Sequence, residues 1–360
     1  MAFSLNSLLR KAPSSLLGID ISPSSVKVVE LEPGQKAPMR LRRYAIEPIA
    51  RGAIVDGNIE QAEQVAEALT RALRRMNTRT REAALALPTS AVITKRITLP
   101  AGLTEEDYEL QVESEASQYI PFAIEEVNLD FQLIGPSAST EDEVDVLLAA
   151  SRKEKVEDRV AVADMCGLKA VIMDVESYAA HQVLEQIVRG LPQTAQDEVI
   201  ALFDIGSQST SVMMVINGQT VFEREQPFGG MQLTQDLVRL YGLLPEEAEA
   251  RKKSGDLPES YALDALQPFI EQGVVEASRA LQFFFTSTPY TRVDRICLAG
   301  GASVVPGLAD AIAERTGVPT AILNPFGGME VDSSVRDQQL RQEAPALLTA
   351  CGLAMRRFDA

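Results

Sequence analysis

The feature that most constrains the fold of this chain is a motif that occurs twice. Each copy has an apolar run that ends in an aspartate, then a turn of small residues, then a second β-branched run. The copies span residues 16–29 and 199–216, and a third strand and an amphipathic helix are expected after each. An internal repeat of this kind predicts a duplicated α/β fold, in which each half contributes three antiparallel strands and a helix.

Two further segments interrupt the halves. Residues 83–167 read as an extra α/β segment, and residues 243–289 read as a smaller helical insert. In the second half the dipeptide Asn217-Gly218 is a strong hairpin signal. The pattern predicts strands around 42–47, 84–87, 144–149, 210–216 and 220–225, and helices around 60–76, 105–119, 153–166 and 231–240.

Composition excludes several classes of protein. The formal net charge of -17 argues against a general nucleic-acid binder and against broad electrostatic adsorption to anionic lipid. A single histidine excludes a histidine-based metal site, and three scattered cysteines are typical of a reducing compartment. No apolar run is long enough to span a bilayer. We therefore expect a cytoplasmic protein.

The two hairpins are suited to holding a triphosphate. Backbone N–H groups of a tight turn can bind phosphate oxygens, and an aspartate at each entry, Asp20 and Asp204, can hold Mg²⁺ through its water shell. Lys27 adds a positive charge beyond the first turn. A third turn, Gly300-Gly301, would bring backbone against a flat ligand. The alternative for any one of these turns is an ordinary tight turn.

This order of motifs resembles the ATPase superfamily of actins, chaperones and sugar kinases. The resemblance implies ATP and Mg²⁺ as cofactors. Actins usually have a glycine where Ser22 stands here, and Pro23 stiffens the turn. A phosphate group can therefore approach the backbone of this turn less freely. The cofactor-binding residues that the resemblance implies are Ser22, Ser24, Ser25 and Lys27 in the first turn, Gly206, Ser207, Ser209 and Thr210 in the second, Gly229 and Gly230 in "FGGMQLTQDL", and Gly300, Gly301 and Ala302 in the adenosine motif.

Three more residues take roles from the same resemblance. The segment "AEARKKSG" is similar to a superfamily motif in which Glu249 and Lys252 would contact ribose or adenine. The alternative is a simple i,i+3 ion pair. Glu176 stands where hydrolases of the superfamily carry a water-activating residue, and with Asp20 it is the catalytic candidate. The alternative is that Glu176 stabilises a helix N-terminus. At most a slow ATPase is expected.

The position of the first insert resembles FtsA, a cell-division protein. The segments "LLGIDISPSSVKVVEL", "ALALPTSAVITKRITLP" and "VIMDVESYAAHQVL" together resemble the PilM family of actin-like type IV pilus assembly proteins. The implied fold is an actin-like ATPase with ribonuclease H-like duplicated domains and an FtsA-type extra α/β subdomain. The expected divisions are an N-terminal peptide (1–14), subdomain 1A (15–82 with 168–196), inserted subdomain 1C (83–167), subdomain 2A (197–242 with 290–360) and subdomain 2B (243–289).

The resemblance implies an ATP-binding scaffold of type IV pilus assembly and twitching motility, peripheral at the inner membrane through its partners. These would be the cytosolic N-terminal segment of PilN and other inner-membrane or motor proteins of the pilus, with no nucleic acid. Self-association stays open. The acidic residues within 104–130 would attract a positively charged peptide, or form a solvated face. The alternatives are a small-molecule kinase of the superfamily and an FtsA-like filament-forming protein.

Overall fold

The computed structural model describes residues 15–137, 140, 142–189 and 197–358, so the predicted N-terminal peptide lies outside the described residues. The chain divides into two compact units. Among the described residues, the first unit consists of those within 15–27 and 45–178, and the second of those within 28–44 and 179–358. Each unit is considered by itself below. The finer division into four subdomains stays a prediction.

Three parallel strands lie side by side in the first unit, in the order β10 (Lys169–Val175), β6 (Glu82–Leu87), β1 (Leu16–Ser22). Ile19 pairs with Leu85, and Asp174 pairs with Ala86. The carboxyl ends of these strands therefore meet at one edge. Helices α1 (Ala62–Met76) and α3 (Lys153–Met165) and a short hairpin of β4 (Ile54–Val55) and β5 (Asn58–Ile59) belong to the same unit.

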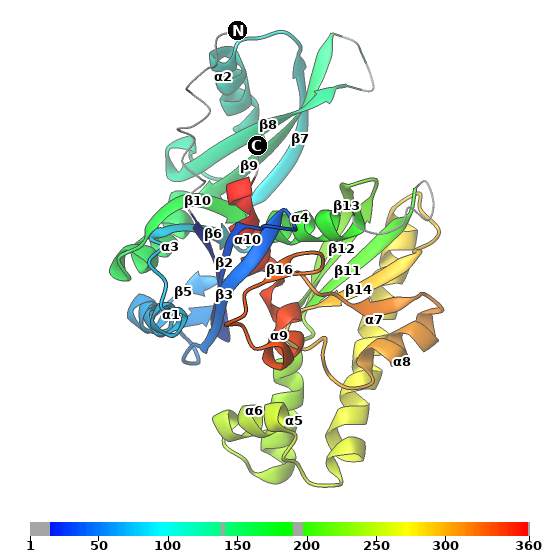
Figure 1. The fold of residues 1–360 in the computed structure, drawn as a ribbon. Coiled ribbons are helices and arrows are strands. Elements are labelled where there is room, and N and C mark those ends of the chain that lie inside the picture. The colour runs from blue at the N-terminus through cyan, green and yellow to red at the C-terminus, as the bar shows by residue number, and fades with distance from the viewer. Residues whose placement is uncertain (1–14, 138–139, 141, 190–196, 359–360) are drawn as a thin grey trace. The chain divides into compact units, whose positions relative to one another are not determined.

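The inserted segment forms a separate antiparallel sheet in the order β7-β9-β8 (Figure 1). Its strands are β7 (Ile93–Pro100), β8 (Val127–Pro136) and β9 (Glu143–Arg152), and it includes helix α2 (Glu105–Ala116). Tyr108 and Val112 of this helix pack with Val146 and Leu148 of β9 in one buried cluster. The sequence predicted β9 and the helix but missed β7 and β8.

The second unit contains a five-stranded sheet in the order β13-β12-β11-β14-β15. β11 (Val199–Ile205), β12 (Thr210–Ile216) and β13 (Gln219–Gln226) are antiparallel, whereas β14 (Arg295–Ala299) and β15 (Thr320–Ile322) run parallel to β11. Asn217 and Gly218 both have positive φ, as the predicted hairpin turn requires. β6 runs parallel to β1 as β14 does to β11, which agrees with the duplication.

Helices complete the second unit. Phe228 stacks on Phe269 of α7 at 5.0 Å between ring centroids, in the core that joins these helices to the sheet. Helix α4 (Glu176–Arg189) starts in the first unit and continues in the second. No helix within the described ranges is long and apolar enough to cross a membrane. The remaining helices are α5 (Gly230–Tyr241), α6 (Pro245–Ser254), α7 (Gln267–Ser287), α8 (Leu308–Thr316), α9 (Asp337–Glu343) and α10 (Leu348–Met355), with a π-helical segment at Ala262–Leu266.

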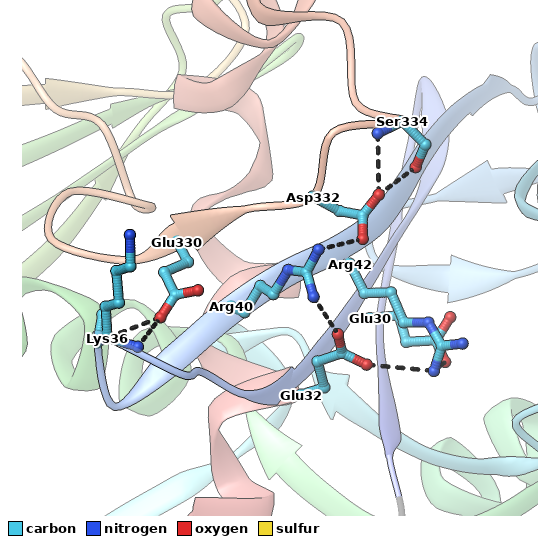
Figure 2. Close-up of polar contacts among 9 residues, drawn as sticks. Glu30, Glu32, Lys36, Arg40, Arg42, Glu330, Asp332 and Ser334 are labelled. Carbon is cyan, nitrogen blue, oxygen red and sulfur yellow. Dashed lines mark hydrogen bonds and ion pairs between the residues drawn. The ribbon is translucent and has the colours of Figure 1, made fainter.

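An ionic network ties together three strands whose residues 28–33, 39–44 and 330–331 belong to the second unit. These are β2 (Ser25–Pro33), β3 (Met39–Pro48) and β16 (Glu330–Val331), of which β16 pairs in parallel with β3. Arg40 bridges the carboxylates of Glu32, at 3.2 Å, and Asp332, at 2.6 Å (Figure 2). The network fixes the segment after β15 to the β2–β3 hairpin.

Glu330 closes the hairpin turn. Its Oε1 accepts hydrogen bonds from the backbone N–H groups of Lys36 and Ala37, the second at 2.8 Å (Figure 2). These N–H groups hold the pKa of Glu330 below its ordinary value of 4.5. A carboxyl group whose pKa is lowered in the folded state stabilises the fold at pH values above its pKa in the unfolded state. This contribution is lost as the pH falls through the pKa of the folded state.

We therefore expect Glu330→Gln to lower stability at neutral pH, with the difference shrinking as the pH falls through and below 4.5. The neutral amide is a weaker acceptor than a carboxylate for the two N–H groups. Urea unfolding at a series of pH values measures this. Glu314→Gln, at an exposed position on α8, is the matched control. A pH-independent loss in Glu330→Gln would contradict the explanation.

Candidate functional site

The first predicted phosphate turn lies in the first unit and joins β1 to β2. Lys27 Nζ lies 2.7 Å from Asp20 Oδ2 and 3.2 Å from Ser22 Oγ. Ser22 Oγ in turn donates to the carbonyl oxygen of Ser25 at 3.0 Å, and the carbonyl of Ser24 accepts from the Ile49 N–H at 3.1 Å. Asp20 is 6% exposed. The structure thus brings the acid and the lysine of this motif into direct contact within a closed turn.

Glu176 directly follows β10 and is the first residue of α4. This position agrees with the alternative that its charge stabilises the helix N-terminus. It also lies at the edge where the parallel strands of the first unit end, because Val175 pairs with Leu87. The structure leaves both roles of Glu176 open, and the catalytic role stays a prediction.

A residue that the sequence did not single out lies near this edge. Arg159 of α3 is fully buried, at 1% exposure. Its Nε donates to the carbonyl oxygen of Ala86 at 2.8 Å, and its Nη2 donates to that of Gly57 at 3.1 Å. Burial lowers the pKa of Arg159, while the charges of Glu176, Asp158 and Asp20 oppose this. A buried cation is therefore coupled electrostatically to both catalytic candidates.

The second predicted phosphate turn, between β11 and β12, lies in the second unit. The Gly206 N–H donates to the carbonyl of Ser209 at 2.9 Å, which closes the turn. The N–H groups of Ser207 and Gln208 donate to no oxygen of the residues that the structure describes. Two adjacent backbone donors in a tight turn make a concave anion site. Gln208, which the sequence analysis did not name, is thus one of the candidate donors.

The glycine pair that opens α5 packs directly on this turn. The Gly230 N–H donates to the carbonyl of Gly206 at 3.0 Å, and the Met231 N–H donates to that of Ser207 at 2.7 Å. A β-carbon added to Gly229 would lie 2.5 Å from the carbonyl oxygen of Ser207, which is too close for any side chain. Glycine is therefore required here by close backbone packing.

The third turn joins the same assembly. Gly300 has φ +84°, and the Ala302 N–H donates to the carbonyl of Ile205 at 3.0 Å. A β-carbon on Gly300 would meet Oδ1 of Asp204 at 2.5 Å, so this turn lies directly against the second aspartate. Within the second unit, the structure therefore brings together the predicted residues of the second, glycine-pair and adenosine motifs.

Glu249 and Lys252 of α6 are connected to these turns by hydrogen bonds with Thr234 of α5. Lys252 Nζ lies 2.6 Å from Glu249 Oε2 and donates to Thr234 Oγ1 at 2.7 Å and to the carbonyl of Gly230 at 3.2 Å. The i,i+3 ion pair that the sequence allowed is therefore present, and it is anchored to the glycine pair. Thr234 was part of the quoted motif, but its role as the link could not be read from the sequence.

The electrostatics of this cluster follow from its burial. Burial lowers the pKa of Lys252, although Glu249 opposes the shift. Burial would raise the pKa of Glu249, but the ammonium of Lys252 and its hydrogen bonds keep that pKa below the ordinary value. Glu249 is thus a carboxylate at neutral pH, available to a hydroxyl donor such as a ribose.

The residues present fit a nucleotide. The turn at Ser207 and Gln208 offers N–H donors without an acceptor among the residues described, and Gly229, Gly230 and Gly300 leave no side chain over the adjoining backbone. Carboxylate oxygens at Asp20 and Asp204 are of the type that Mg²⁺ accepts through its water shell.

Two solved structures resemble this chain over most of its length. The chain resembles the PilM of a structure described as "PilM-PilN type IV pilus biogenesis complex", with 29% identity, a TM-score of 0.80, and coverage of 97% of this chain and 100% of that one. It also resembles the ethanolamine utilization protein EutJ from Carboxydothermus hydrogenoformans, with 16% identity, a TM-score of 0.55, and coverage of 95% and 90%. The second likeness concerns the fold alone.

The duplicated sheets, together with the likeness to these structures, define an actin-like ATPase fold, as the sequence predicted. The family model for "Type IV pilus assembly protein PilM" matches residues 18–358. The chain therefore belongs to the PilM family of type IV pilus assembly proteins.

Proposed function

We propose that this protein is a nucleotide-binding scaffold of type IV pilus assembly that binds the cytosolic N-terminal segment of a PilN-type partner. The observation that carries this proposal is the likeness, over 97% of the chain, to the PilM of a PilM–PilN complex. Through such a partner the protein would be peripheral at the inner membrane. Other pilus proteins and further copies of this chain are additional candidate partners.

ATP with Mg²⁺ is the proposed ligand. Bound Mg-ATP would supply phosphate charge and a hydrolysable bond. The N–H groups of Ser207 and Gln208 would donate to phosphate oxygens, and Lys27 would neutralise part of their charge. Asp20 and Asp204 would accept hydrogen bonds from the waters of the metal ion. The open donors of the β11–β12 turn support these assignments.

Glu249 and Lys252 are proposed as contacts to ribose or adenine. In the described structure they satisfy each other and Thr234, at 2.6–2.8 Å. A nucleotide would therefore exchange hydrogen bonds with a formed cluster rather than order free side chains. The remaining proposed contacts are the small residues Ser22, Ser24, Ser25, Gly206, Ser209, Thr210, Gly229, Gly230, Gly300, Gly301 and Ala302.

Hydrolysis, if it occurs, is proposed to be slow. Glu176 would orient a water for in-line attack, with Asp20 at the same strand edge. Glu176 also stands at the first position of α4, where its charge would instead stabilise the helix N-terminus. A residue that serves the helix in this way is a poorly adapted general base, so binding and not turnover is the function that we propose.

The partner segment is proposed to meet the inserted module. Helix α2 carries Glu105, Glu106 and Asp107 in its first turn and further exposed acids along its length. A partner peptide with positive charge would be attracted to this face. The attraction would weaken with salt, because exposed charges are screened.

Isothermal titration calorimetry with Mg-ATP tests the proposal. We expect micromolar binding, at a Kd of about 1–100 μM. Lys27→Ala and Asp204→Ala should each weaken it at least about tenfold, because each removes a charge opposite phosphate or metal. Asp310→Ala, at an exposed site on α8, is the control.

Repeating the titration with the PilN-type N-terminal peptide measures coupling between the two sites. A shift in either affinity gives the coupling free energy, which must be the same in both directions. If the folded protein bound the peptide but not ATP, it would be a passive peptide-binding scaffold. Robust phosphorylation of a sugar panel would instead favour the kinase alternative.

A further inference from the structure

Five arginines crowd into a short stretch of an otherwise acidic protein. The segment from Arg71 to Arg81 contains Arg71, Arg74, Arg75, Arg79 and Arg81, and it contains no aspartate or glutamate. All five side chains are exposed. We call them the arginine patch. The whole chain carries a net charge of -17, so the patch is a local reversal of charge.

The helix end gathers three of these side chains on one face. Arg71, Arg74 and Arg75 are spaced i, i+3 and i+4 at the C-terminal end of α1. Arg71 and Arg75 flank Glu47 of β3, at 3.7 Å and 3.4 Å. That carboxylate is shared by two arginines, and 51% of the Arg75 side chain stays exposed. The face therefore keeps an excess of positive charge.

The loop after α1 carries the other two arginines, of which Arg81 is hydrogen-bonded within the loop. The helix ends at Asn77, whose φ is 48°, and Thr78 is buried at 8% exposure. Arg81 donates from Nη1 to the carbonyl of Thr80 at 2.9 Å, and its own carbonyl accepts from the Lys169 N–H at 2.7 Å. The loop is thus anchored to β10 at its far end.

Two arginines of the patch have charges that no ion pair within the described residues neutralises. Neither Arg74 nor Arg79 forms an ion pair with any residue in the described part of the chain. The helix dipole accounts for cations in the last turn of α1, but its influence ends within that turn. Arg79 and Arg81 lie beyond it, so the dipole does not explain the patch.

The apolar residues within the segment are buried or half-buried. Met76 is 5% exposed, and Leu73 is half-buried. A protein–protein interface is usually centred on buried aromatic or aliphatic anchors, and the patch offers none. Guanidinium groups bind phosphate oxygens in pairs of hydrogen bonds, and contact with lipid headgroups needs no inserted side chain.

We propose that the arginine patch docks the protein on an anionic phospholipid surface. The remaining acidic surface is repelled by such a membrane, so the patch would fix one orientation of the first unit. A cluster of this size contributes only weak affinity at physiological salt. Weak affinity is enough if a membrane-anchored partner already holds the protein nearby. The proposal itself rests on this chain's charges and not on the partner or the nucleotide.

Vesicle flotation of the full chain tests the proposal directly. We expect binding at low salt to vesicles of equal parts phosphatidylglycerol and phosphatidylcholine, and none to phosphatidylcholine alone. Added salt should weaken the binding. The variant Arg74→Gln, Arg75→Gln, Arg79→Gln should bind at least about tenfold more weakly. The control variant Arg189→Gln, Arg239→Gln, Arg341→Gln changes net charge equally at exposed sites of the second unit.

Equal losses in the two triple variants would overturn the proposal, because net charge and not the patch would then be responsible. Failure of the unaltered protein to float with the anionic vesicles would also overturn it. If that protein bound soluble polyglutamate through the patch instead, the partner would be an acidic protein segment. Each outcome is independent of ATP binding, so the proposed function is tested separately.

Discussion

The Gly300→Ala variant is expected to lose about 2–5 kcal/mol of stability and with it any nucleotide binding. Gly300 has φ +84°, where a side chain is strained. An added β-carbon would also lie 2.3 Å from the carbonyl oxygen of Ile205 and 2.5 Å from Oδ1 of Asp204. Either β11 or the turn must move, and the proposed metal-holding carboxylate moves with them.

Urea unfolding followed by circular dichroism measures the loss, and calorimetry with Mg-ATP measures binding. Gly301→Ala is the matched control for stability, since its β-carbon would meet nothing nearer than Ala346 Cβ at 3.9 Å. The control for binding is Asp310→Ala, because Gly301 is itself a proposed nucleotide contact. A Gly300→Ala protein as stable as the Gly301→Ala protein would show that the turn relaxes freely. Normal stability with lost binding would confine the effect to Asp204.

The second large effect is expected at Arg159. Arg159→Met should cost the first unit about 2–4 kcal/mol, because the buried carbonyl group of Ala86 and the partly buried one of Gly57 lose their donor. The methionine fills similar space, so the cost reflects hydrogen bonds and charge more than a cavity. Arg159→Lys keeps the charge but offers one donor centre in place of a fork, and an intermediate loss is expected.

Hydrogen exchange resolves this effect by segment. Faster exchange is expected in β6 and the β4–β5 hairpin of Arg159→Met, with no change in β11–β13 of the second unit. Arg96→Met, at an exposed position of β7, is the control. Uniform protection in all three proteins would mean that water replaces the guanidinium without loss.

The sequence predicted the repeated hairpins well because both are bounded by strong signals. β12 begins and ends where periodicity placed it, and Asn217-Gly218 adopts the positive φ values of a two-residue turn. Strand β7 was missed for a physical reason, whereas β8 alternates Val127, Leu129 and Phe131 with polar residues and was predictable. Most side chains of β7 are exposed, including Lys95 and Arg96, so the strand lacks the apolar alternation on which the prediction depended.

The candidate site was predictable where glycine is required and unpredictable where contacts are long-range. Gly229 and Gly300 stand out in the sequence, and close backbone packing explains both. The link from Lys252 to Thr234 depends on how α6 packs against α5, which no local pattern encodes. Arg159 reads as one more charged position on a helix, and only the tertiary structure shows that it is buried.

The inserted sheet has a consequence for the order in which the first unit folds. β6 and β10 are neighbours, yet the whole module from β7 to α3 separates them along the chain. The module has its own buried cluster and consists of sequence-local hairpin pairs such as β8 with β9. Once the module has folded, the connection between β6 and β10 is short and rigid instead of long and flexible. This lowers the entropic cost of pairing β10 with β6. A module that folds early would thus speed the assembly of the strand edge that carries Asp20 and Glu176. A destabilising substitution in the module would slow that assembly, although it lies far from both residues in the sequence.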